Sequence, residues 1–176
     1  HDYKISRRLL SYIFHKFDTE NKTYFSSKKL EKIENFLENI HIYHKNLPKH
    51  LSLTHNDFTA RNIFFLKDAV LIYDWELACY QNPEHDLIEF LIFELQRFDD
   101  NEVRELIAYY KNNLFSALNI NMQNEDYKRI LKFNTLEYIV NKLSVYRLAD
   151  ISLKFDFMSR VCRNAARMLL LIEEEF

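Results

Sequence analysis

Apolar residues recur at intervals of three and four along most of the chain, and this period predicts amphipathic α-helices. The pattern first covers residues 4–17 and, after a polar stretch at residues 18–26, begins again near Ser27. This second helix should end before Pro48, because a proline ring disfavours helix in the residue that precedes it. In the second half of the chain, the same period predicts four further helices, at residues 83–98, 101–118, 124–151 and 156–174.

Between residues 51 and 75 the pattern changes from helical to extended. Two apolar runs, residues 63–66 and 70–73, are separated by Lys67 and Asp68, which predicts a β-hairpin with these two residues at its turn. The turn lacks the Asn-Gly pair of common two-residue hairpins, so Asp68 is expected to adopt the left-handed conformation. The chain is therefore predicted to be a mainly α protein with one small β-hairpin, an α+β fold.

The length of 176 residues fits a single domain with enough chain for a sizeable core. We expect a helical part over residues 1–50, a loop and hairpin over residues 51–82, and a second helical part over residues 83–176. The chain contains no glycine, although a chain of this length ordinarily holds on the order of a dozen. This absence excludes the glycine-dependent motifs of P-loop enzymes, dinucleotide-binding folds and hydrolases with a nucleophile elbow.

Charge and hydropathy narrow the function classes further. The chain has 24 Lys and Arg residues against 26 Asp and Glu residues, which argues against binding nucleic acid through a basic face. No apolar stretch approaches the ~20 residues of a membrane span. Cys79 and Cys162 are two lone thiols without a CxxC spacing. They fit a reducing compartment, so the cytoplasm is the expected location.

Polar side chains with metal-binding and acid–base chemistry lie at the two ends of the predicted hairpin. Asp57 and Asn62 precede its first strand, and Asp74 follows its second. Because a hairpin returns its second end beside its first, Asn62 and Asp74 should be near neighbours, with Asp57 a short loop away. Carboxylate and amide oxygens suit Mg²⁺, and an aspartate beside such an ion can orient a hydroxyl and accept its proton. The three residues therefore indicate phosphoryl transfer.

Three sequence segments in this region carry a recognisable pattern: HNDFTARN at residues 55–62, IYDWE at residues 72–76 and PEHDL at residues 83–87. They resemble the catalytic segment of the aminoglycoside phosphotransferase and choline kinase family. The family pattern is HxDxxxxN, then a strand that ends in IDWE or IDFE, then an Asp-Leu pair that opens the next helix. Asn56 stands where many members have glycine, a variant also found in choline-kinase-like members. The resemblance covers about residues 51–93, and it implies the C-terminal lobe of a protein-kinase-like fold.

The resemblance assigns roles to individual residues. Asp57 matches the catalytic aspartate, and Asn62 and Asp74 match the two ligands of Mg²⁺, with ATP as the co-substrate. In the family, the histidine of the motif supports the catalytic loop and the later aspartate holds the loop backbone. The supporting residues that it implies in this chain are His55, Arg61 and Asp86.

The sequence after Asp74 also bears on the acceptor. In protein kinases the corresponding aspartate is followed by Phe-Gly and a long activation loop. Here Trp-Glu follows Asp74, and the next helix begins near Pro83. This leaves no room for an activation loop, so a small hydroxylated metabolite is a better substrate than a peptide. Trp75 and Glu76 are the best candidates for contact with the acceptor, because they follow Asp74 at the mouth of the site.

Acidic residues near the site favour an amine-bearing acceptor, such as an aminoglycoside or choline. Glu89 and Glu94 are further candidates for this attraction, and they are explained equally well as solvated helix positions. A cage for a quaternary ammonium group would need aromatic residues, although aromatic residues at helical spacing more often belong to a core. The available aromatic residues are Trp75, Tyr80, Tyr138 and Tyr146.

A working kinase of this family also needs an N-terminal lobe, whose strands supply a phosphate-covering loop and a lysine for the nucleotide phosphates. About fifty residues precede Leu51 and are predicted to be helical, so this lobe is expected to be absent and the chain alone inactive. Three explanations fit: the chain is part of a longer polypeptide, a second chain supplies the lobe in trans, or the lineage has lost phosphotransfer. In the last case the chain would be a helical binding or regulatory module.

Overall fold

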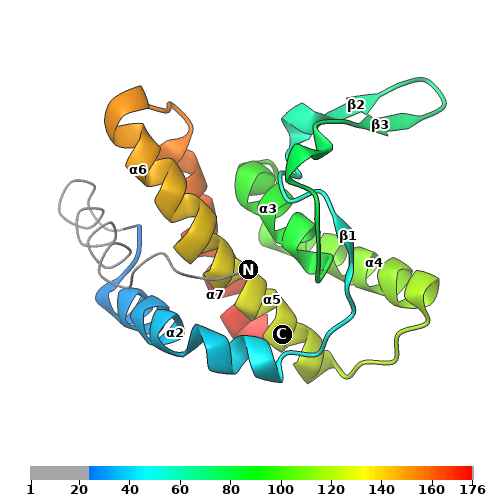
Figure 1. The fold of residues 1–176 in the computed structure, drawn as a ribbon, viewed down its shortest axis with the longest axis horizontal. Helices are drawn as coiled ribbons and strands as arrows, with labels where there is room; N and C mark the ends of the chain where they lie inside the picture. The colour runs from blue at the N-terminus through cyan, green and yellow to red at the C-terminus, as the bar shows by residue number, and fades with distance from the viewer. Residues whose placement is uncertain (1–23, 176) are drawn as a thin grey trace.

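A helical body with two short strand pairs makes up residues 24–175, the part of the chain that the computed structural model describes (Figure 1). Its helices are α2 (Ser27–Asn46), α3 (Glu84–Glu94), α4 (Asp100–Leu118), α5 (Asn124–Tyr138), α6 (Ser144–Leu153) and α7 (Met158–Glu175). The start near Ser27 and the end before Pro48 are confirmed by α2. The predicted helix at residues 4–17 lies outside the described residues.

The core lies between α3, α5 and α7, which pack against one another. Ile88, Leu91 and Ile92 of α3 are completely buried. Leu131 of α5 and Ile172 of α7 are buried to the same extent and belong to the same cluster. Removing a side chain of this size from water stabilises the fold by roughly 1.5–3 kcal/mol, so α3 is firmly held in the body.

The ends of the helices follow local capping chemistry. Asp99 opens α4 with a capping box: it accepts hydrogen bonds from the amides of Asn101 (2.8 Å) and Glu102 (2.9 Å), and Glu102 accepts one from the amide of Asp99 (2.8 Å). α3 is shorter than predicted, because it ends at Glu94 and continues as the 3₁₀ turn Leu95–Arg97.

The segment predicted as one helix over residues 124–151 contains a π-helical turn, Ile139–Leu143, between α5 and α6. The prediction of uninterrupted α-helix is wrong there. The segment contains no proline and no glycine, so the sequence gives no signal for the change. The buried hydroxyl of Ser144 donates a hydrogen bond to the carbonyl oxygen of Ile139 at 3.1 Å. It thereby satisfies a backbone group at the turn, where the α-helical bonding pattern is interrupted.

Residues other than glycine occupy the left-handed backbone positions of this fold. Those with positive φ in the described part are Asn56 (60°), Asp74 (68°), Asn119 (52°) and Lys154 (53°). Asn and Asp tolerate this conformation best, and here two of them lie in the region of the predicted site. The expectation of a left-handed Asp68 is wrong, because its φ is not positive; the hairpin turn is closed by a hydrogen bond from the amide of Leu66 to the carbonyl oxygen of Ala69 (2.8 Å).

Two antiparallel strand pairs connect the helices to the loop at residues 55–62, called here the 55–62 loop. β2 (Ile63–Phe65) pairs with β3 (Val70–Ile72), which confirms the predicted hairpin. β1 (Ser52–Thr54) pairs with β4 (Cys79–Gln81), and this pairing was not predicted because each strand has only three residues. The β1–β4 pair brings the start of the loop next to the segment that follows β3.

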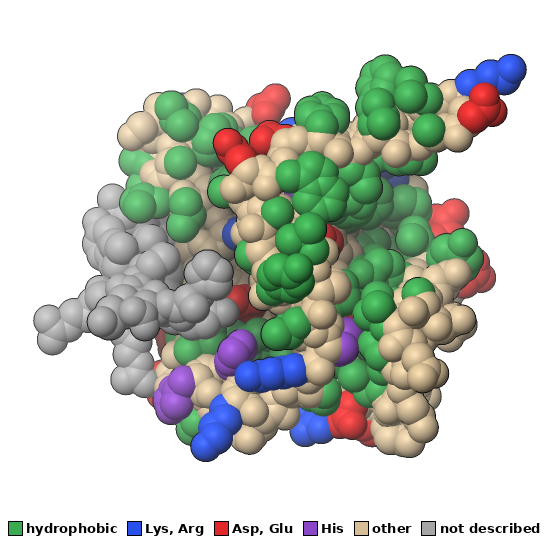
Figure 2. Space-filling view, turned by 45° about the vertical axis from the view of Figure 1, so that its right-hand side comes forward, with side chains coloured by type: hydrophobic (Ala, Val, Ile, Leu, Met, Phe, Trp, Pro, Cys, Tyr) green, Lys and Arg blue, Asp and Glu red, His purple; other side chains and the backbone are tan. Residues whose placement is uncertain are grey.

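The β2–β3 hairpin projects from the helical body (Figure 1) and exposes large apolar side chains. Phe65 alone is 75% exposed. Figure 2 shows apolar side chains along the hairpin and charged ones at its tip. An exposed apolar patch of this kind is typical of a contact surface. The large apolar residues exposed on the hairpin are Phe64, Phe65, Leu66, Val70, Leu71, Ile72 and Tyr73.

Candidate functional site

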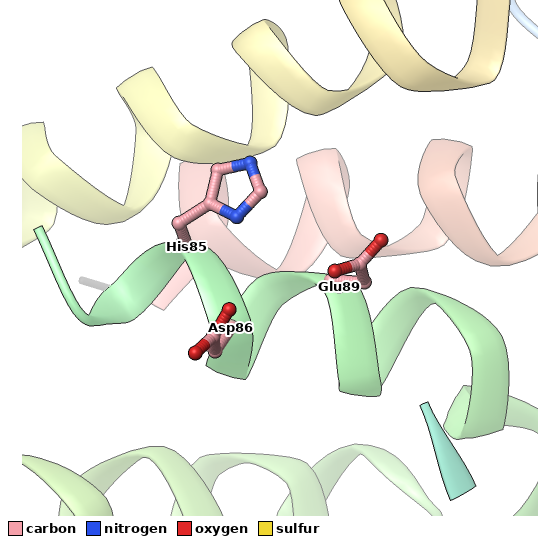
Figure 3. A group of neighbouring side chains, drawn as sticks. All are labelled: His85, Asp86 and Glu89. Carbon is pink, nitrogen blue, oxygen red and sulfur yellow. The ribbon is translucent and has the colours of Figure 1, made fainter. Parts of the chain in front are cut away.

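Helix α3 carries three neighbouring polar side chains beside the 55–62 loop: His85, Asp86 and Glu89 (Figure 3). One possible ligand atom from each lies within 4.8 Å of the others, a spacing that a metal ion could bridge. All four carboxylate oxygens already accept hydrogen bonds, from the loop backbone or from Lys142. The group therefore supports the loop rather than a cation.

The two carboxylates bind the backbone of the 55–62 loop. Asp86 accepts hydrogen bonds from the amides of His55 (2.7 Å) and Asn56 (2.9 Å). Glu89, nearly one turn further along α3, accepts one from the amide of Phe58 at 2.9 Å. Residues at i and i+3 share a helix face, so this face of α3 determines the path of the loop.

His55 joins the loop to the end of β3. Its buried ring contacts the carbonyl oxygen of Tyr73 through Nε2 at 2.7 Å, and its Nδ1 accepts a hydrogen bond from the amide of Asp57 at 3.2 Å. A carbonyl oxygen can only accept, so Nε2 is the donor in this contact and Nδ1 the acceptor in the other. The ring of Trp75 lies 4.8 Å from the ring of His55, centroid to centroid.

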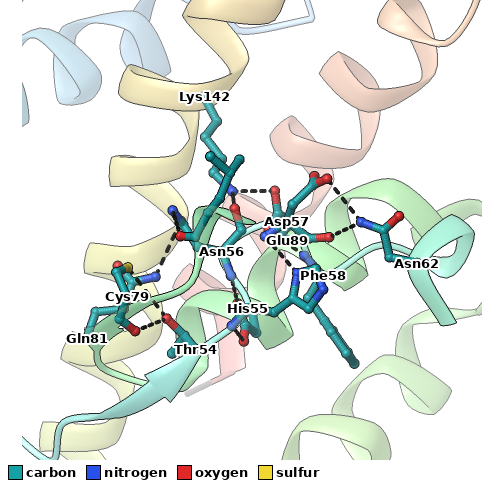
Figure 4. Close-up of polar contacts among 12 residues, drawn as sticks. Thr54, His55, Asn56, Asp57, Phe58, Asn62, Cys79, Gln81, Glu89 and Lys142 are labelled. Carbon is teal, nitrogen blue, oxygen red and sulfur yellow. Dashed lines mark hydrogen bonds and ion pairs between the residues drawn. The ribbon is translucent and has the colours of Figure 1, made fainter. Parts of the chain in front are cut away.

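The carboxylate of Asp57 is held by two later residues of the same loop (Figure 4). The Nδ2 of Asn62 donates to the Asp57 carbonyl oxygen at 2.9 Å and to its Oδ2 at 3.0 Å. The Arg61 guanidinium contacts both carboxylate oxygens, at 3.2 and 2.9 Å. Asp57 and Asn62 are buried, whereas the Arg61 side chain is 63% exposed, so solvent screens this ion pair. The Oδ1 of Asn62 points away from Asp57.

Asp74 lies at the same end of the hairpin as Asn62. The amide of Tyr73 donates to the carbonyl oxygen of Asn62 at 3.1 Å, and Asp74 is the next residue along the chain. Its side chain is exposed and has no hydrogen-bond or ion-pair partner among residues 24–175. Trp75 and Glu76 follow in the exposed 3₁₀ turn Trp75–Leu77. The structure thus brings Asp57 and Asn62 into direct contact and places Asp74 at the adjacent strand end.

Three polar residues in or near the site were misinterpreted or missed from the sequence. Glu89 is completely buried, so it is neither a solvated helix position nor a surface charge for an amine. The same holds for Glu94, which is 9% exposed and pairs with Arg97 at 2.5 Å. Lys142, which contacts Glu89 at 2.7 Å, had no signal in the sequence. For Glu89 a signal existed, since it interrupts an apolar run three residues after Asp86.

The aromatic residues considered for a cage divide between core and surface. Tyr138 is 1% exposed and belongs to the core. Tyr146 packs against that core, with its ring 6.2 Å from the rings of Phe93 and Phe157. Tyr80 is 75% exposed on β4. Tyr138 and Tyr146 therefore have packing roles, as their helical spacing suggested.

Burial shifts the titration of the side chains on α3. It raises the pKa of the Asp86 carboxyl, even though the two loop amides favour the charged form. It also raises the pKa of Glu89, against the opposing charge of Lys142. Burial lowers the pKa of His85 to about 3, and the charge of Lys142 acts in the same direction. His85 is therefore neutral at the base of the site.

The shift at His85 predicts a pH dependence of stability. The unfolded chain takes up a proton near the ordinary pKa of 6.5 and the folded chain only near 3, so stability falls as pH is lowered between these values. The raised pKa values of Asp86 and Glu89 act in the opposite direction. Urea unfolding of wild type and of His85→Leu measures this contribution. The difference between their unfolding free energies should change by about 1.4 kcal/mol per pH unit in this range. If the two unfolding free energies vary in parallel with pH, the lowered pKa of His85 is contradicted.

The helical body and the hairpin at its site form a kinase-like fold. The chain is similar to the crystal structure of a choline/ethanolamine kinase family protein from Mesorhizobium loti, with a TM-score of 0.58 and 16% sequence identity. The match covers 96% of this chain and 53% of that one, so the chain spans about half the length of that structure. Comparison with curated protein sequences gave no match.

The family is established by sequence. The model of the phosphotransferase enzyme family matches residues 6–120, which include the 55–62 loop, the hairpin and α3. The chain therefore belongs to the phosphotransferase enzyme family. No helix among residues 24–175 has both the length and the apolar character needed to cross a membrane.

Proposed function

We propose that the chain is the catalytic and acceptor-binding lobe of an ATP-dependent small-molecule kinase. The enzyme transfers the γ-phosphoryl group of ATP to a hydroxyl of a metabolite or an antibiotic. The observation that carries this proposal is the Asp57 carboxylate, fixed by Asn62 in a loop whose backbone amides are bound by α3. Membership of the phosphotransferase enzyme family supports the reaction class.

In this proposal Asp57 is the catalytic residue. Its carboxylate accepts a hydrogen bond from the acceptor hydroxyl and takes the proton as the hydroxyl oxygen attacks the γ-phosphorus. The bond between the γ-phosphorus and the bridging oxygen of ATP breaks, and ADP leaves with the electron pair. Asn62 keeps the carboxylate oriented through its Nδ2, at 3.0 Å from Oδ2. Positioning of this kind supplies much of the rate in phosphoryl transfer.

The side chains present fit a Mg²⁺ site. Asn62 uses its Nδ2 for Asp57, which leaves Oδ1 directed away from it. Asp74, at the adjacent strand end, has an exposed carboxylate without a partner among residues 24–175. Mg²⁺ prefers carboxylate and carbonyl oxygens together with substrate phosphates. We therefore assign Asn62 and Asp74 as the residues that would hold the ion, which supplies charge neutralisation for the phosphates when bound.

Trp75 and Glu76 are proposed to contact the acceptor. Both are exposed and directly follow Asp74, and Trp75 is fixed by a hydrogen bond from its Nε1 to the carbonyl oxygen of Ile72 at 2.8 Å. An exposed carboxylate beside an indole favours an amine-bearing acceptor of the aminoglycoside or choline type.

A further lobe is needed for ATP, and the hairpin is its proposed contact surface. The exposed apolar residues of β2 and β3 call for a covering partner, since a lone two-stranded hairpin is marginally stable in water. The coverage of 53% of the Mesorhizobium loti structure is consistent with additional chain in the complete enzyme. We propose that this nucleotide-binding lobe is supplied in cis or in trans.

Binding of Mn²⁺, as a paramagnetic probe for Mg²⁺, tests the assignment on the 176-residue chain. Weak, saturable broadening of the NMR signals of Asn62 and Asp74 is expected, and Asp74→Asn should remove it because the variant lacks the charged ligand. Asp68→Asn, at the exposed hairpin turn, is the matched control and should behave as wild type. Broadening that persists in Asp74→Asn, or that centres on another part of the chain, would refute the site.

A further inference from the structure

A single ion pair contacts the loop backbone on both sides of Asp57. The ammonium group of Lys142 donates to Glu89 Oε1 at 2.7 Å and also to the carbonyl oxygen of Asn56. The second oxygen of Glu89 accepts the amide of Phe58 at 2.9 Å. The pair thus binds the residue before Asp57 through a carbonyl group and the residue after it through an amide (Figure 4).

Burial gives this pair a large influence on the loop. The Glu89 side chain is completely buried and that of Lys142 is 19% exposed. Separating such a pair leaves a charge in a medium that solvates it poorly, so neither partner is readily lost. Asp86 holds the amides of His55 and Asn56 on its own. The ion pair adds the contact with Phe58, beyond Asp57, that Asp86 does not make.

Lys142 lies within the π-helical turn Ile139–Leu143, and from there it contacts the loop. A residue added to an α-helical path turns everything after it by about 100° relative to the preceding part. The buried Ser144 hydroxyl bonds to the Ile139 carbonyl and stabilises the widened turn. π-helical turns are frequent at functional sites, and this one contacts the loop that holds Asp57 through Lys142.

The backbone conformation at Asn56 also depends on this ion pair. Asn56 has a φ of 60°, a left-handed conformation that asparagine tolerates and that the surrounding contacts hold here. Its amide binds Asp86, its carbonyl oxygen binds Lys142, and its Nδ2 donates to the carbonyl oxygen of Leu77 at 3.0 Å. Three hydrogen bonds therefore hold the residue directly before Asp57.

We propose that the Lys142–Glu89 pair is a positioning device for Asp57, which holds the backbone at Asn56 and Phe58 so that the carboxylate keeps one orientation. Lys142 and Glu89 are positioning residues, because they act through the loop and not on the substrate. The consequence for turnover rests on the proposed function, whereas the consequence for the loop does not.

The first test measures amide hydrogen exchange by NMR in the 176-residue chain. Lys142→Met should speed exchange of the Phe58 amide by roughly tenfold to a hundredfold, since a charge-assisted contact that orders its acceptor is lost. Core amides of α3 should keep their protection. Lys142→Arg should restore part of the Phe58 protection, and Lys132→Met, at an exposed position of α5, is the matched control.

Unchanged exchange at Phe58 in a folded Lys142→Met variant would overturn the proposal. If that variant does not fold, Glu89→Leu replaces it, because leucine leaves neither a buried carboxylate charge nor an acceptor for the Phe58 amide. Faster exchange at Phe58 in Glu89→Leu supports the device, and exchange at the wild-type rate overturns it.

The second test measures turnover in the native enzyme with its nucleotide-binding lobe. Lys142→Met should lower kcat by about tenfold and leave the KM for the acceptor unchanged, as expected for a misplaced carboxylate. A raised KM with unchanged kcat would contradict a positioning role. The two proposals can fail separately. If Asp57→Asn keeps its activity, the proposed function is refuted, whereas the exchange rate at Phe58 still tests the positioning role of the Lys142–Glu89 pair.

Discussion

Replacing Asp57 by asparagine is expected to lower kcat of the native enzyme by about 10²–10⁴-fold. The amide oxygen of the variant can still accept hydrogen bonds from Arg61 and Asn62, which in wild type lie 2.9 and 3.0 Å from Asp57 Oδ2. It cannot take a proton from the acceptor hydroxyl. The fold and the affinity for Mg-ATP should therefore be retained. Steady-state kinetics would measure kcat, and a binding titration would measure the affinity for Mg-ATP.

The control for this variant is Asp68→Asn, which makes the same chemical change at the exposed turn of the hairpin. It should turn over at the wild-type rate. Turnover by Asp57→Asn close to that of the control would show that Asp57 is not the catalytic residue.

Replacing Asp86 by alanine is expected to lower the unfolding free energy of the 176-residue chain by about 2–4 kcal/mol. The amides of His55 and Asn56 lose their acceptor, and a buried donor without a partner costs about 1–3 kcal/mol. The loss is partly offset, because burial of the carboxylate is itself unfavourable and raises its pKa. Urea unfolding at neutral pH measures the difference.

Asp156→Ala is the control for Asp86→Ala, since Asp156 is exposed in the turn before α7. Its unfolding free energy should stay within about 0.5 kcal/mol of wild type. If Asp86→Ala is equally stable, the two backbone hydrogen bonds do not support the loop in the way described.

Much of the fold follows from the periodicity of the sequence. The three- and four-residue spacing that places Ile33 and Phe36 on one face of α2 also buries both in the structure. The hairpin follows from two apolar runs around Lys67 and Asp68, and its pairing matches. These elements depend on local pattern, which a single sequence contains.

The remaining elements depend on contacts between distant residues. The three-residue strands β1 and β4 are too short for a pattern and form because Thr54 and Cys79 meet in space. The π-helical turn is stabilised by Ser144, a residue without a distinctive helical or non-helical preference in this position. No local signal could therefore reveal either of them.

In the candidate site too, local sequence pattern predicted some residues, and contacts between distant residues determine others. The spacing of Asp57, Asn62 and Asp74 about a hairpin predicted that they would lie near one end of it, and the structure places them there. Lys142 meets a residue 86 positions earlier, so its role was invisible in the sequence. Glu89 was misjudged because a charged residue in a helix is usually solvated, whereas here its side chain is completely buried and pairs with Lys142.

The proposed function makes this chain the site of phosphoryl transfer from ATP to an alcohol. The decisive measurement is mass spectrometry of acceptors after incubation with Mg-ATP and the native enzyme, including its nucleotide-binding lobe. Choline, ethanolamine and a set of aminoglycosides are the first acceptors to use. One acceptor class should gain the mass of a phosphoryl group, and Asp57→Asn should form this product about 10²–10⁴-fold more slowly. Binding of Mg-ATP without transfer to any hydroxylated amine, or transfer by Asp57→Asn at a rate close to that of wild type, would contradict this function.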